Sequence, residues 1–296
     1  MTNHTGPILA QRDGLTVIRC RTCGYAHLDP LPEVADLRAL YADGFWEREK
    51  AGELAHYREQ AEWWRMTHND WLGVLESANG GQPGALLDVG AGYGMFLERA
   101  LRRGWDALGI EPSLTAAEYA DPEGRRVFRG AFEDYKPGWM GVNRFDAVTA
   151  LWVLEHLTDP LAFLDRCRGL LKPRGLLMLV VPNEWTMAQA RANTVTARPY
   201  WWLDKTHVNY FDWTSLANLL GLRGFRIVDR LSTYPMENFI VADGMDYPAH
   251  PGMGRDLHRR VEQAEIAVTS DERIALSSER ACIGVGRDIV AIARME

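Results

Sequence analysis

The stretch from residue 86 to residue 100, LLDVGAGYGMFLERA, constrains the fold of this chain more than any other segment. It begins with a short apolar run, as in a strand that is buried on both faces, and the run ends at Asp88 and three glycines, Gly90, Gly92 and Gly94. Apolar residues then recur at helical spacing, so a helix is expected to begin at the last glycine. The stretch therefore predicts a strand, a glycine-rich turn and a helix.

The glycine-rich turn predicts a binding site for an anionic cofactor. Glycines let backbone N–H groups approach a ligand without a Cβ in the way, and a helix N-terminus favours a phosphate or a carboxylate. The spacing D-x-G-x-G-x-G differs from the G-x-G-x-x-G of dinucleotide-binding proteins. It resembles motif I of the class I S-adenosylmethionine (SAM) methyltransferases. The resemblance implies that Asp88, Gly90, Gly92 and Gly94 contact SAM.

An acid follows the second expected strand, residues 105–110. Glu111 lies 21 residues after Gly90, where a βαβ unit places an acid that accepts hydrogen bonds from ribose hydroxyls. Pro112 follows it, and a solvated loop acid is the alternative interpretation. The resemblance further implies that Phe132 and Glu133, which come after a brief third strand at 126–128, contact the adenine of SAM.

A second specific signal follows the fourth expected strand, residues 145–151. The segment WVLEHLTDP, residues 152–160, resembles motif IV of the same family. Ligands of open parallel sheets bind at the strand ends near the topological switch point, so we expect Leu151 and Trp152 to border the methionine end of SAM. His156, inside this segment, is a candidate general base, or it shapes the pocket through bonds to the backbone.

A long aromatic segment, residues 184–212, is expected to form a loop after the fifth strand, residues 176–181. His207 is our first choice of general base there, because a neutral imidazole can accept a proton from a hydroxyl or ammonium group. Tyr210 is the next candidate in the segment. The alternative is packing without a catalytic role. The candidate substrate-binding residues are Trp46, Trp185, Arg198, Tyr200, Trp201 and Trp202.

The order of elements predicts an α/β fold with a Rossmann-like, mostly parallel seven-stranded sheet and helices on both faces. The resemblance implies that the last strand, residues 286–293, runs antiparallel between the fifth strand and the sixth, residues 225–231. A single amphipathic helix is expected over 54–75, and another helix within an insertion before the last strand. We expect four parts: a knuckle and helical lid (1–78), the SAM-binding core (79–231), an inserted helical cap (232–283) and the last strand (284–296).

A Cys-x-x-Cys knuckle near the N-terminus, Cys20 to Cys23 followed by Gly24, resembles half of a zinc ribbon. Tetrahedral zinc takes four protein ligands in a structural site, and no second Cys-x-x-Cys is present in the sequence. His4 and His27 are the nearby candidates for the missing ligands. We therefore expect a metal-free hairpin and no bound metal.

Charge and composition restrict the partners and the location that we expect for this chain. With 33 basic and 40 acidic residues the chain carries a net charge of −7 without a dense basic cluster, which argues against nucleic acid as a partner. No run of about 18 apolar residues exists, and the N-terminus lacks the pattern of a signal peptide, so we expect a cytoplasmic protein that does not bind membranes.

Together these features predict SAM-dependent methyl transfer to a small-molecule acceptor in a biosynthetic pathway, by in-line displacement, with O-methylation favoured. The alternatives are N- or C-methylation of a sugar or nucleotide-sugar, an NAD-dependent oxidoreductase, and a SAM-binding protein without catalysis. A homodimer through the C-terminal insertion is a further hypothesis, because a segment of about 50 residues before the last strand must cap the sheet or pair with another subunit.

Overall fold

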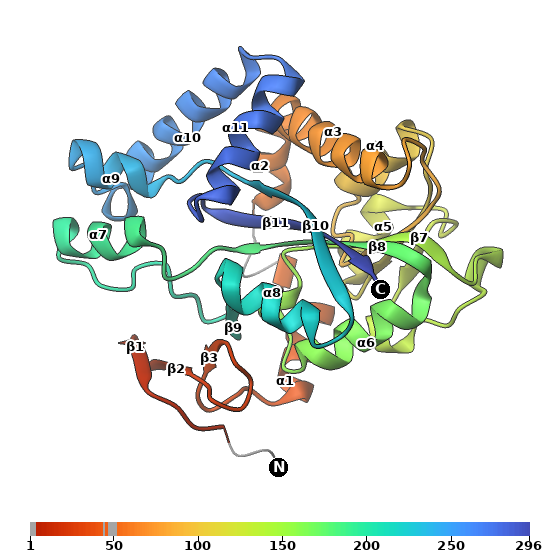
Figure 1. The fold of residues 1–296 in the computed structure, drawn as a ribbon, viewed down its shortest axis with the longest axis horizontal. Coiled ribbons are helices and arrows are strands. Elements are labelled where there is room, and N and C mark those ends of the chain that lie inside the picture. The colour runs from red at the N-terminus through yellow and green to blue at the C-terminus, as the bar shows by residue number, and fades with distance from the viewer. Residues whose placement is uncertain (1–3, 44, 47–51) are drawn as a thin grey trace.

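In the computed structural model, a seven-stranded sheet forms the centre of the molecule, and helices cover both of its faces (Figure 1). The structure describes residues 4–43, 45–46 and 52–296. The strand order is β10-β11-β8-β7-β4-β5-β6. The bounds of these strands in chain order are β4 (Ala85–Val89), β5 (Asp106–Glu111), β6 (Val127–Arg129), β7 (Phe145–Leu151), β8 (Leu171–Pro182), β10 (Phe225–Ser232) and β11 (Asp288–Met295).

The strand directions confirm the predicted fold. Strands β4 to β8 pair in parallel, whereas β11 lies between β8 and β10 and runs antiparallel to both. Strands β5 and β6 lie on one side of β4, and β7 and β8 lie on the other, so the topological switch point is between β4 and β7. The glycine-rich turn and the motif IV segment both leave the sheet at this point.

Both faces of the sheet are buried, which is why its strands read as continuous apolar runs. Helices α6 (Pro160–Leu170) and α8 (Trp213–Gly221) cover one face, and α3 (Ala61–Ala78) and α4 (Met95–Arg102) the other (Figure 1). In β8 the residues alternate between two apolar clusters: Leu177 and Leu179 face the first, and Leu176 and Met178 the second. α5 (Leu114–Ala120) packs beside β5 and β6.

The predicted single helix over 54–75 is wrong, because the chain bends at Gln60. The structure has α1 (Val34–Asp43), α2 (Glu53–Glu59) and then α3, and Gln60 has φ −100° and ψ 15° between the last two. The Gln60 side chain donates to Glu262, and Trp63 donates to Glu265 at 2.7 Å. These contacts with a distant part of the chain prevail over the local helical pattern. Residues 44 and 47–51 of the predicted lid lie outside the described residues.

Two further predictions need correction. Residues 184–212, which were expected to form a loop, contain the helix α7 (Met187–Thr196) and the short strand β9 (Asn209–Tyr210). A reciprocal capping box between Thr186 and Gln189 begins α7. The insertion contains several helices where one was expected, because a capping box at Thr269 starts a new helix. Its helices are α9 (Glu237–Asp243), α10 (Pro251–Ile266) and α11 (Ser270–Cys282).

The N-terminal residues form a second sheet, which the sequence did not predict. It has the order β1-β2-β3-β9 and consists of β1 (Ile8–Arg12), β2 (Leu15–Arg19), β3 (Ala26–Leu28) and the strand β9 from the far end of the aromatic segment. The hairpin therefore lies directly against β9 (Figure 1). The division of the chain into four parts stays a prediction.

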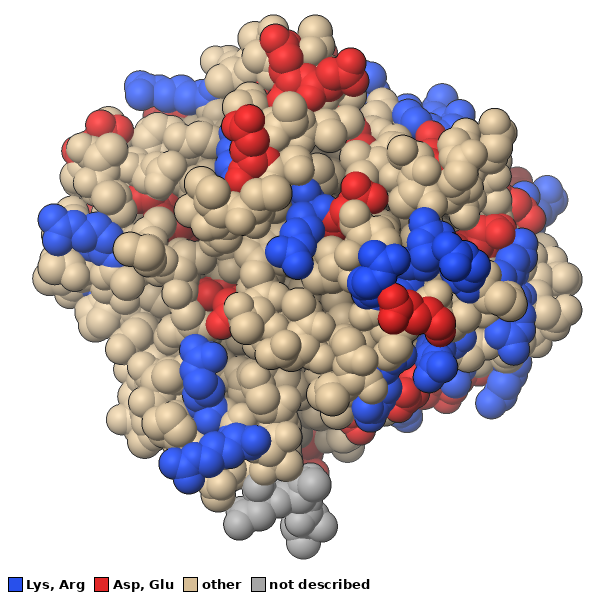
Figure 2. Space-filling view, viewed as in Figure 1, with Lys and Arg blue, Asp and Glu red and all other residues tan. Residues whose placement is uncertain are grey.

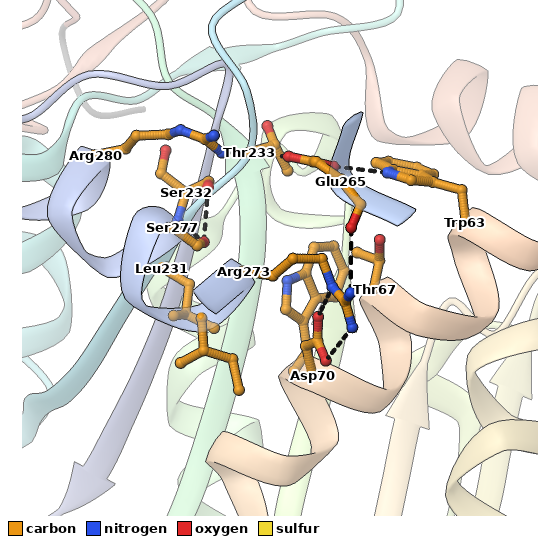
Figure 3. Close-up of a pocket in the computed structure, with 12 residues that line it drawn as sticks. Trp63, Thr67, Asp70, Leu231, Ser232, Thr233, Glu265, Arg273, Ser277 and Arg280 are labelled. Carbon is orange, nitrogen blue, oxygen red and sulfur yellow. Dashed lines mark hydrogen bonds and ion pairs between the residues drawn. The ribbon is translucent and has the colours of Figure 1, made fainter. Parts of the chain in front are cut away.

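The insertion is held on the sheet by polar contacts with α3 (Figure 3). Arg273 of α11 donates to both carboxylate oxygens of Asp70, at 2.6 and 3.2 Å, and Trp63 meets Glu265 beside this pair. The cleft between these elements measures only about 40 Å³, and its charges are largely paired with one another. The cleft is therefore an interface at which these elements pack against one another.

Short 3-10 helices connect several of the larger elements, namely η2 (Phe132–Asp134), η3 (Trp139–Gly141), η4 (Leu154–His156) and η5 (Tyr247–Ala249). Among the described residues, no helix has both the length and the apolar character that crossing a bilayer would require.

Candidate active site

Two adjoining cavities lie at the carboxyl ends of the central strands. The first, of about 400 Å³, we call the glutamate cavity; the second, of about 380 Å³, we call the histidine cavity. Gly90, Trp46, Trp152 and His156 line both, so the cavities meet at these residues. The glutamate cavity is further lined by Glu111, Pro112, Phe132 and Glu133, and the histidine cavity by Asp88, Gly92, Leu151, Glu155 and His207.

The glycine-rich turn brings the backbone close to both cavities. Gly90 and Ala91 donate their N–H groups to the carbonyl oxygen of Ile110 at 2.8 and 2.9 Å, which ties the turn to the end of β5. A Cβ atom at Gly90 would lie 2.6 Å from Cγ2 of Val153, so no larger residue fits. Gly94, with φ +78°, caps α4 as predicted.

Glu111 is fixed at the end of β5 by hydrogen bonds to its carboxylate. The backbone N–H groups of Gly92 and Ser113 donate to it at 2.8 and 3.0 Å, and the Trp46 indole donates at 3.4 Å. Only 4% of Glu111 is exposed, and this burial raises its pKa, although the hydrogen bonds act in the opposite direction. A fixed carboxylate on a cavity wall suits a pair of hydroxyl groups, as on a ribose.

Asp88 is a second buried acid, at the end of β4. Thr149 of β7 donates its hydroxyl to the Asp88 carboxylate at 2.7 Å. Burial raises the pKa of Asp88 from 3.8 to about 7; the Thr149 hydrogen bond opposes this effect and the charge of Glu111 adds to it. A cationic group in the histidine cavity would favour the ionised form of Asp88.

The residues predicted to contact adenine line the same cavity as the predicted ribose acceptor. Phe132 is buried between the Phe163 ring, at 5.2 Å, and the Arg166 guanidinium, at 4.9 Å. Glu133 is exposed and forms an ion pair with Arg38 of α1 at 3.7 Å. The structure thus brings together Glu111, Phe132 and Glu133, which are separated in the sequence.

Glu155, His156 and His207 form a cluster in the wall of the histidine cavity. Each places one ligand-type atom within 4.8 Å of the other two, and the two imidazole rings are 5.1 Å apart. His156 lies 2.8 Å from the carbonyl oxygen of Thr206 through Nδ1, so this nitrogen carries the hydrogen. A carboxylate with two imidazoles can hold or transfer a proton, and it is also a donor set for a divalent metal ion.

Backbone and amide contacts fix His207 beside the motif IV segment. Val208 donates its N–H to the carbonyl oxygen of Glu155 at 2.7 Å. The Asn209 amide donates to the carbonyl oxygens of Leu154 and Leu157 at 3.0 and 2.6 Å. The residues on both sides of the cluster therefore hold each other in register.

The remaining candidates from the aromatic segment, residues 184–212, do not line either cavity. Tyr210 is 1% exposed and donates its hydroxyl to the carbonyl oxygen of Asp204 at 3.0 Å, and Arg198 forms an ion pair with Asp246 at 2.7 Å. The others pack between the N-terminal hairpin and the insertion, and they are Trp185, Tyr200, Trp201 and Trp202. Their expected contact with substrate, and the catalytic role expected of Tyr210, therefore lack support in the geometry. Large aromatic side chains stabilise a fold through the apolar area that they bury, and these side chains are packed in the structure.

Sequence reasoning missed the residues that complete the histidine cavity. Tyr57, Trp64 and His68 lie on the expected amphipathic helix and were not among the predicted site residues, yet they line the cavity. Burial, together with Arg99, lowers the pKa of His68 to about 3, so its imidazole is neutral. Arg287, which precedes β11 without any sequence motif, lies between Glu184 at 3.4 Å and Glu237 at 3.9 Å.

A parallel sheet with a glycine-rich turn after its first strand, an acid after its second and a cavity at the switch point defines the class I SAM methyltransferase fold. A family model described as a methyltransferase domain matches residues 55–230, and the chain belongs to this family. The resemblance predicted from motifs I and IV is thereby confirmed, and SAM is the cofactor of this class.

Relatives with curated names match shorter parts of the chain. The ubiquinone biosynthesis O-methyltransferase of Rhodopseudomonas palustris (strain TIE-1) is 38% identical over 104 residues, which cover 33% of this chain and 40% of the relative. The enzyme of the same name from Histophilus somni (strain 2336) is 31% identical over 127 residues, covering 40% of this chain and 52% of the relative. The chain thus spans about half the length, or less, of these curated relatives.

Two solved structures resemble the chain in fold alone. The magnesium protoporphyrin IX methyltransferase of Synechocystis PCC 6803, with bound SAH, has a TM-score of 0.54 and 13% identity, and the match covers 89% of this chain and 100% of that one. The plantazolicin methyltransferase BpumL, with SAH and a substrate analogue, has a TM-score of 0.53 and 13% identity, over 88% and 95% of the two chains.

Proposed function

We propose that this chain transfers the methyl group of SAM to a hydroxyl group of a small-molecule acceptor. The observation that carries the proposal is the junction of the two cavities at Gly90 and Trp152, with Glu111 on one side and His207 on the other. The printed names of the relatives, ubiquinone biosynthesis O-methyltransferases, support oxygen as the atom methylated.

The residues that line the cavities fit SAM in the order predicted from the sequence. Glu111 would accept hydrogen bonds from the ribose, Phe132 and Glu133 would border the adenine, and Leu151 and Trp152 the methionine end. Bound SAM supplies a methyl group that its sulfonium already activates. The protein has to orient the acceptor and remove its proton.

The histidine cluster supplies the proton acceptor in this proposal. His207 lines the cavity beside Glu155 and His156, and we assign it the role of general base. The buried carboxylate of Glu155 favours the imidazolium that forms when His207 accepts a proton.

A small-molecule acceptor also fits the distribution of charge. On the face in Figure 2, acidic side chains lie among the basic ones, without the continuous basic band that follows a nucleic acid backbone. The match to a methyltransferase family favours methyl transfer over the NAD-dependent alternative. N- or C-methylation of a sugar or nucleotide-sugar, and SAM binding without catalysis, are the outcomes against which the test below is designed.

Calorimetry and turnover test the proposal in sequence. SAM and NAD are titrated separately into the purified full chain, and binding of SAM alone is expected. SAH release is then measured with panels of phenolic, alcoholic and amine acceptors, with and without added Mg²⁺. Release with hydroxyl acceptors and without magnesium is expected. Release with amines only, or SAM binding without turnover of any acceptor, would contradict O-methylation; strict dependence on magnesium would assign the cluster to a metal ion.

A further inference from the structure

Four metal-ligating side chains meet in the N-terminal hairpin, and none of them lines either cavity. His4, Cys20, Cys23 and His27 each place one ligand atom within 4.8 Å of the other three. The expectation of a metal-free hairpin rested on two missing ligands, and the fold brings two histidines to the two cysteines. The donor set Cys₂His₂ is a common one for structural zinc.

The distances between the ligand atoms match those around a single tetrahedral zinc ion. With Zn–S of about 2.3 Å and Zn–N of about 2.0 Å, tetrahedral angles separate a nitrogen from a sulfur by about 3.5 Å and two nitrogens by about 3.3 Å. Nδ1 of His4 lies 3.7 Å from Sγ of Cys20, 3.4 Å from Sγ of Cys23 and 3.2 Å from Nε2 of His27.

The surroundings of the cluster orient its ligands. Nδ1 of His27 lies 2.7 Å from the carbonyl oxygen of Leu28, which can only accept, so the hydrogen is on Nδ1 and the lone pair of Nε2 points to the cluster. The backbone N–H of Cys23 donates to Sγ of Cys20 at 3.4 Å, and Gly24, with φ +79°, closes the turn. Cys20 and His27 are each 1% exposed.

The cluster lies beside β9, the short strand that follows His207 in the chain. β3, which contains His27, pairs with β9 through Ala26 with Tyr210 and His27 with Asn209. The N–H of Leu28 also donates to the carbonyl oxygen of Val208 at 2.9 Å. A rigid hairpin at this position therefore supports the segment that carries the proposed base.

We propose that His4, Cys20, Cys23 and His27 bind one structural zinc ion, and that this ion fixes the N-terminal hairpin against β9. Four protein ligands leave no open coordination position, so the ion has no catalytic role. The effect on His207 rests on the proposed function, whereas zinc binding and the fixing of β9 do not depend on it.

Metal analysis tests the site directly. The full chain is expressed with a C-terminal tag that contains no histidine and is purified without chelator. About one equivalent of zinc is expected in the protein and in the control Cys282→Ser, whose thiol is exposed and outside the cluster. The double variant Cys20→Ser/Cys23→Ser should hold less than about a tenth of an equivalent. Cobalt added to the metal-free chain should give the visible absorption of a tetrahedral thiolate site.

A milder variant and a structural readout keep the test decisive if the double variant fails to fold. His4→Ala removes one ligand outside any strand and should weaken zinc about 100-fold in competition with a chelator. Amide hydrogen exchange at residues 207–210 should accelerate when zinc is removed, and exchange in β7 should stay unchanged. The proposal is overturned if the reduced chain takes up neither zinc nor cobalt, or if the cysteine variant retains its zinc. Failure of methyl transfer would leave these metal measurements unaffected.

Discussion

At the scale of single residues, three hydrogen-bond donors fix the Glu111 carboxylate in the candidate cofactor site. Glu111→Ala should weaken SAM by about 1.5 to 3 kcal/mol, because ribose hydroxyls would lose charge-assisted hydrogen bonds. Titration calorimetry measures this, with Glu118→Ala, an exposed acid on α5, as the matched control. Equal dissociation constants for the two variants would refute the ribose assignment.

His207 is tested by separating turnover from binding. His207→Ala should lower kcat by about 100-fold or more with the true acceptor, because a general base acts on the acceptor's proton in the transition state. The affinity for SAM, measured by calorimetry, should change little. The control is His250→Ala, an exposed histidine of the insertion. An unchanged kcat would shift the role to His156 or show that the acceptor needs no base.

Asp88 predicts a pH dependence of stability. Its pKa of about 7 in the folded chain lies above the ordinary 3.8, so between these values the folded state holds a proton that the unfolded chain has released. The free energy of unfolding therefore falls as pH rises from about 4 to about 7, by at most about 4 kcal/mol for this group. Asp88→Asn, which still accepts from Thr149, should reduce the fall.

Urea unfolding at pH 5 and pH 8 measures the Asp88 effect, with the exposed Asp256→Asn as control. The difference in unfolding free energy between the two pH values should be smaller in Asp88→Asn than in the control. The same difference in both variants would mean that Asp88 does not carry the shift.

At the scale of elements, the turn between β4 and α4 combines a left-handed backbone, which glycine adopts without strain, with contact to the cavities. Gly92 has φ +53°, and a Cβ atom there would lie 3.0 Å from the Trp46 ring. Gly92→Ala should cost about 1 to 2 kcal/mol of stability and should also weaken SAM at least tenfold, because the methyl group enters the cavity wall. Gly80→Ala, at φ +80° with no atom within 4 Å, should show the stability cost without the loss of affinity. If calorimetry finds equal SAM affinity in both variants, the proposed contact between this turn and SAM is contradicted.

Elements with strong local signals were predictable, and elements fixed by distant contacts were not. β7 spans 145–151 as predicted from its largely apolar run, which follows the polar Asn143 and Arg144, and α6 begins at Pro160 behind its cap Asp159. The bend at Gln60 depends on Glu262, and β9 forms only because β3 lies beside it. Neither partner can be recognised from the local sequence.

The residues of the candidate site also divide into those with a local sequence signal and those without one. The positions of Glu111, Phe132 and His156 follow from motifs at the ends of strands, so the sequence indicated them. The roles predicted for Trp201 and Tyr210 stay predictions, since both rings are in packing positions and composition cannot distinguish a packed ring from a ring that lines a cavity. Arg287 carries no local signal, because only the pairing of β11 brings it to the histidine cavity.

At the scale of the whole molecule, a largely buried ion pair joins the insertion to the core, beside the hydrogen bonds of Gln60 and Trp63 with α10. The side chains of Arg273 and Asp70 are only 14% and 8% exposed, and Arg273 also donates to the carbonyl oxygens of Glu265 and Val268 at 3.2 and 2.6 Å. A buried charge that loses its partner is costly, whereas an exposed pair contributes little. The pair therefore links α3 to α11 in the folded state (Figure 3). The hypothesis of a homodimer through this insertion stays a prediction.

Arg273→Met should lower the free energy of unfolding by about 3 to 5 kcal/mol, since Asp70 keeps a buried charge without its partner. The control Arg102→Met breaks the exposed pair with Glu98 and should cost about 0.5 kcal/mol or less. Urea unfolding measures both, and hydrogen exchange should locate the loss in α10 and α11. The double variant Asp70→Leu/Arg273→Met should recover part of the stability, because apolar side chains can replace a buried pair. If Arg273→Met were as stable as Arg102→Met, apolar packing between α3 and α11 would hold the insertion instead.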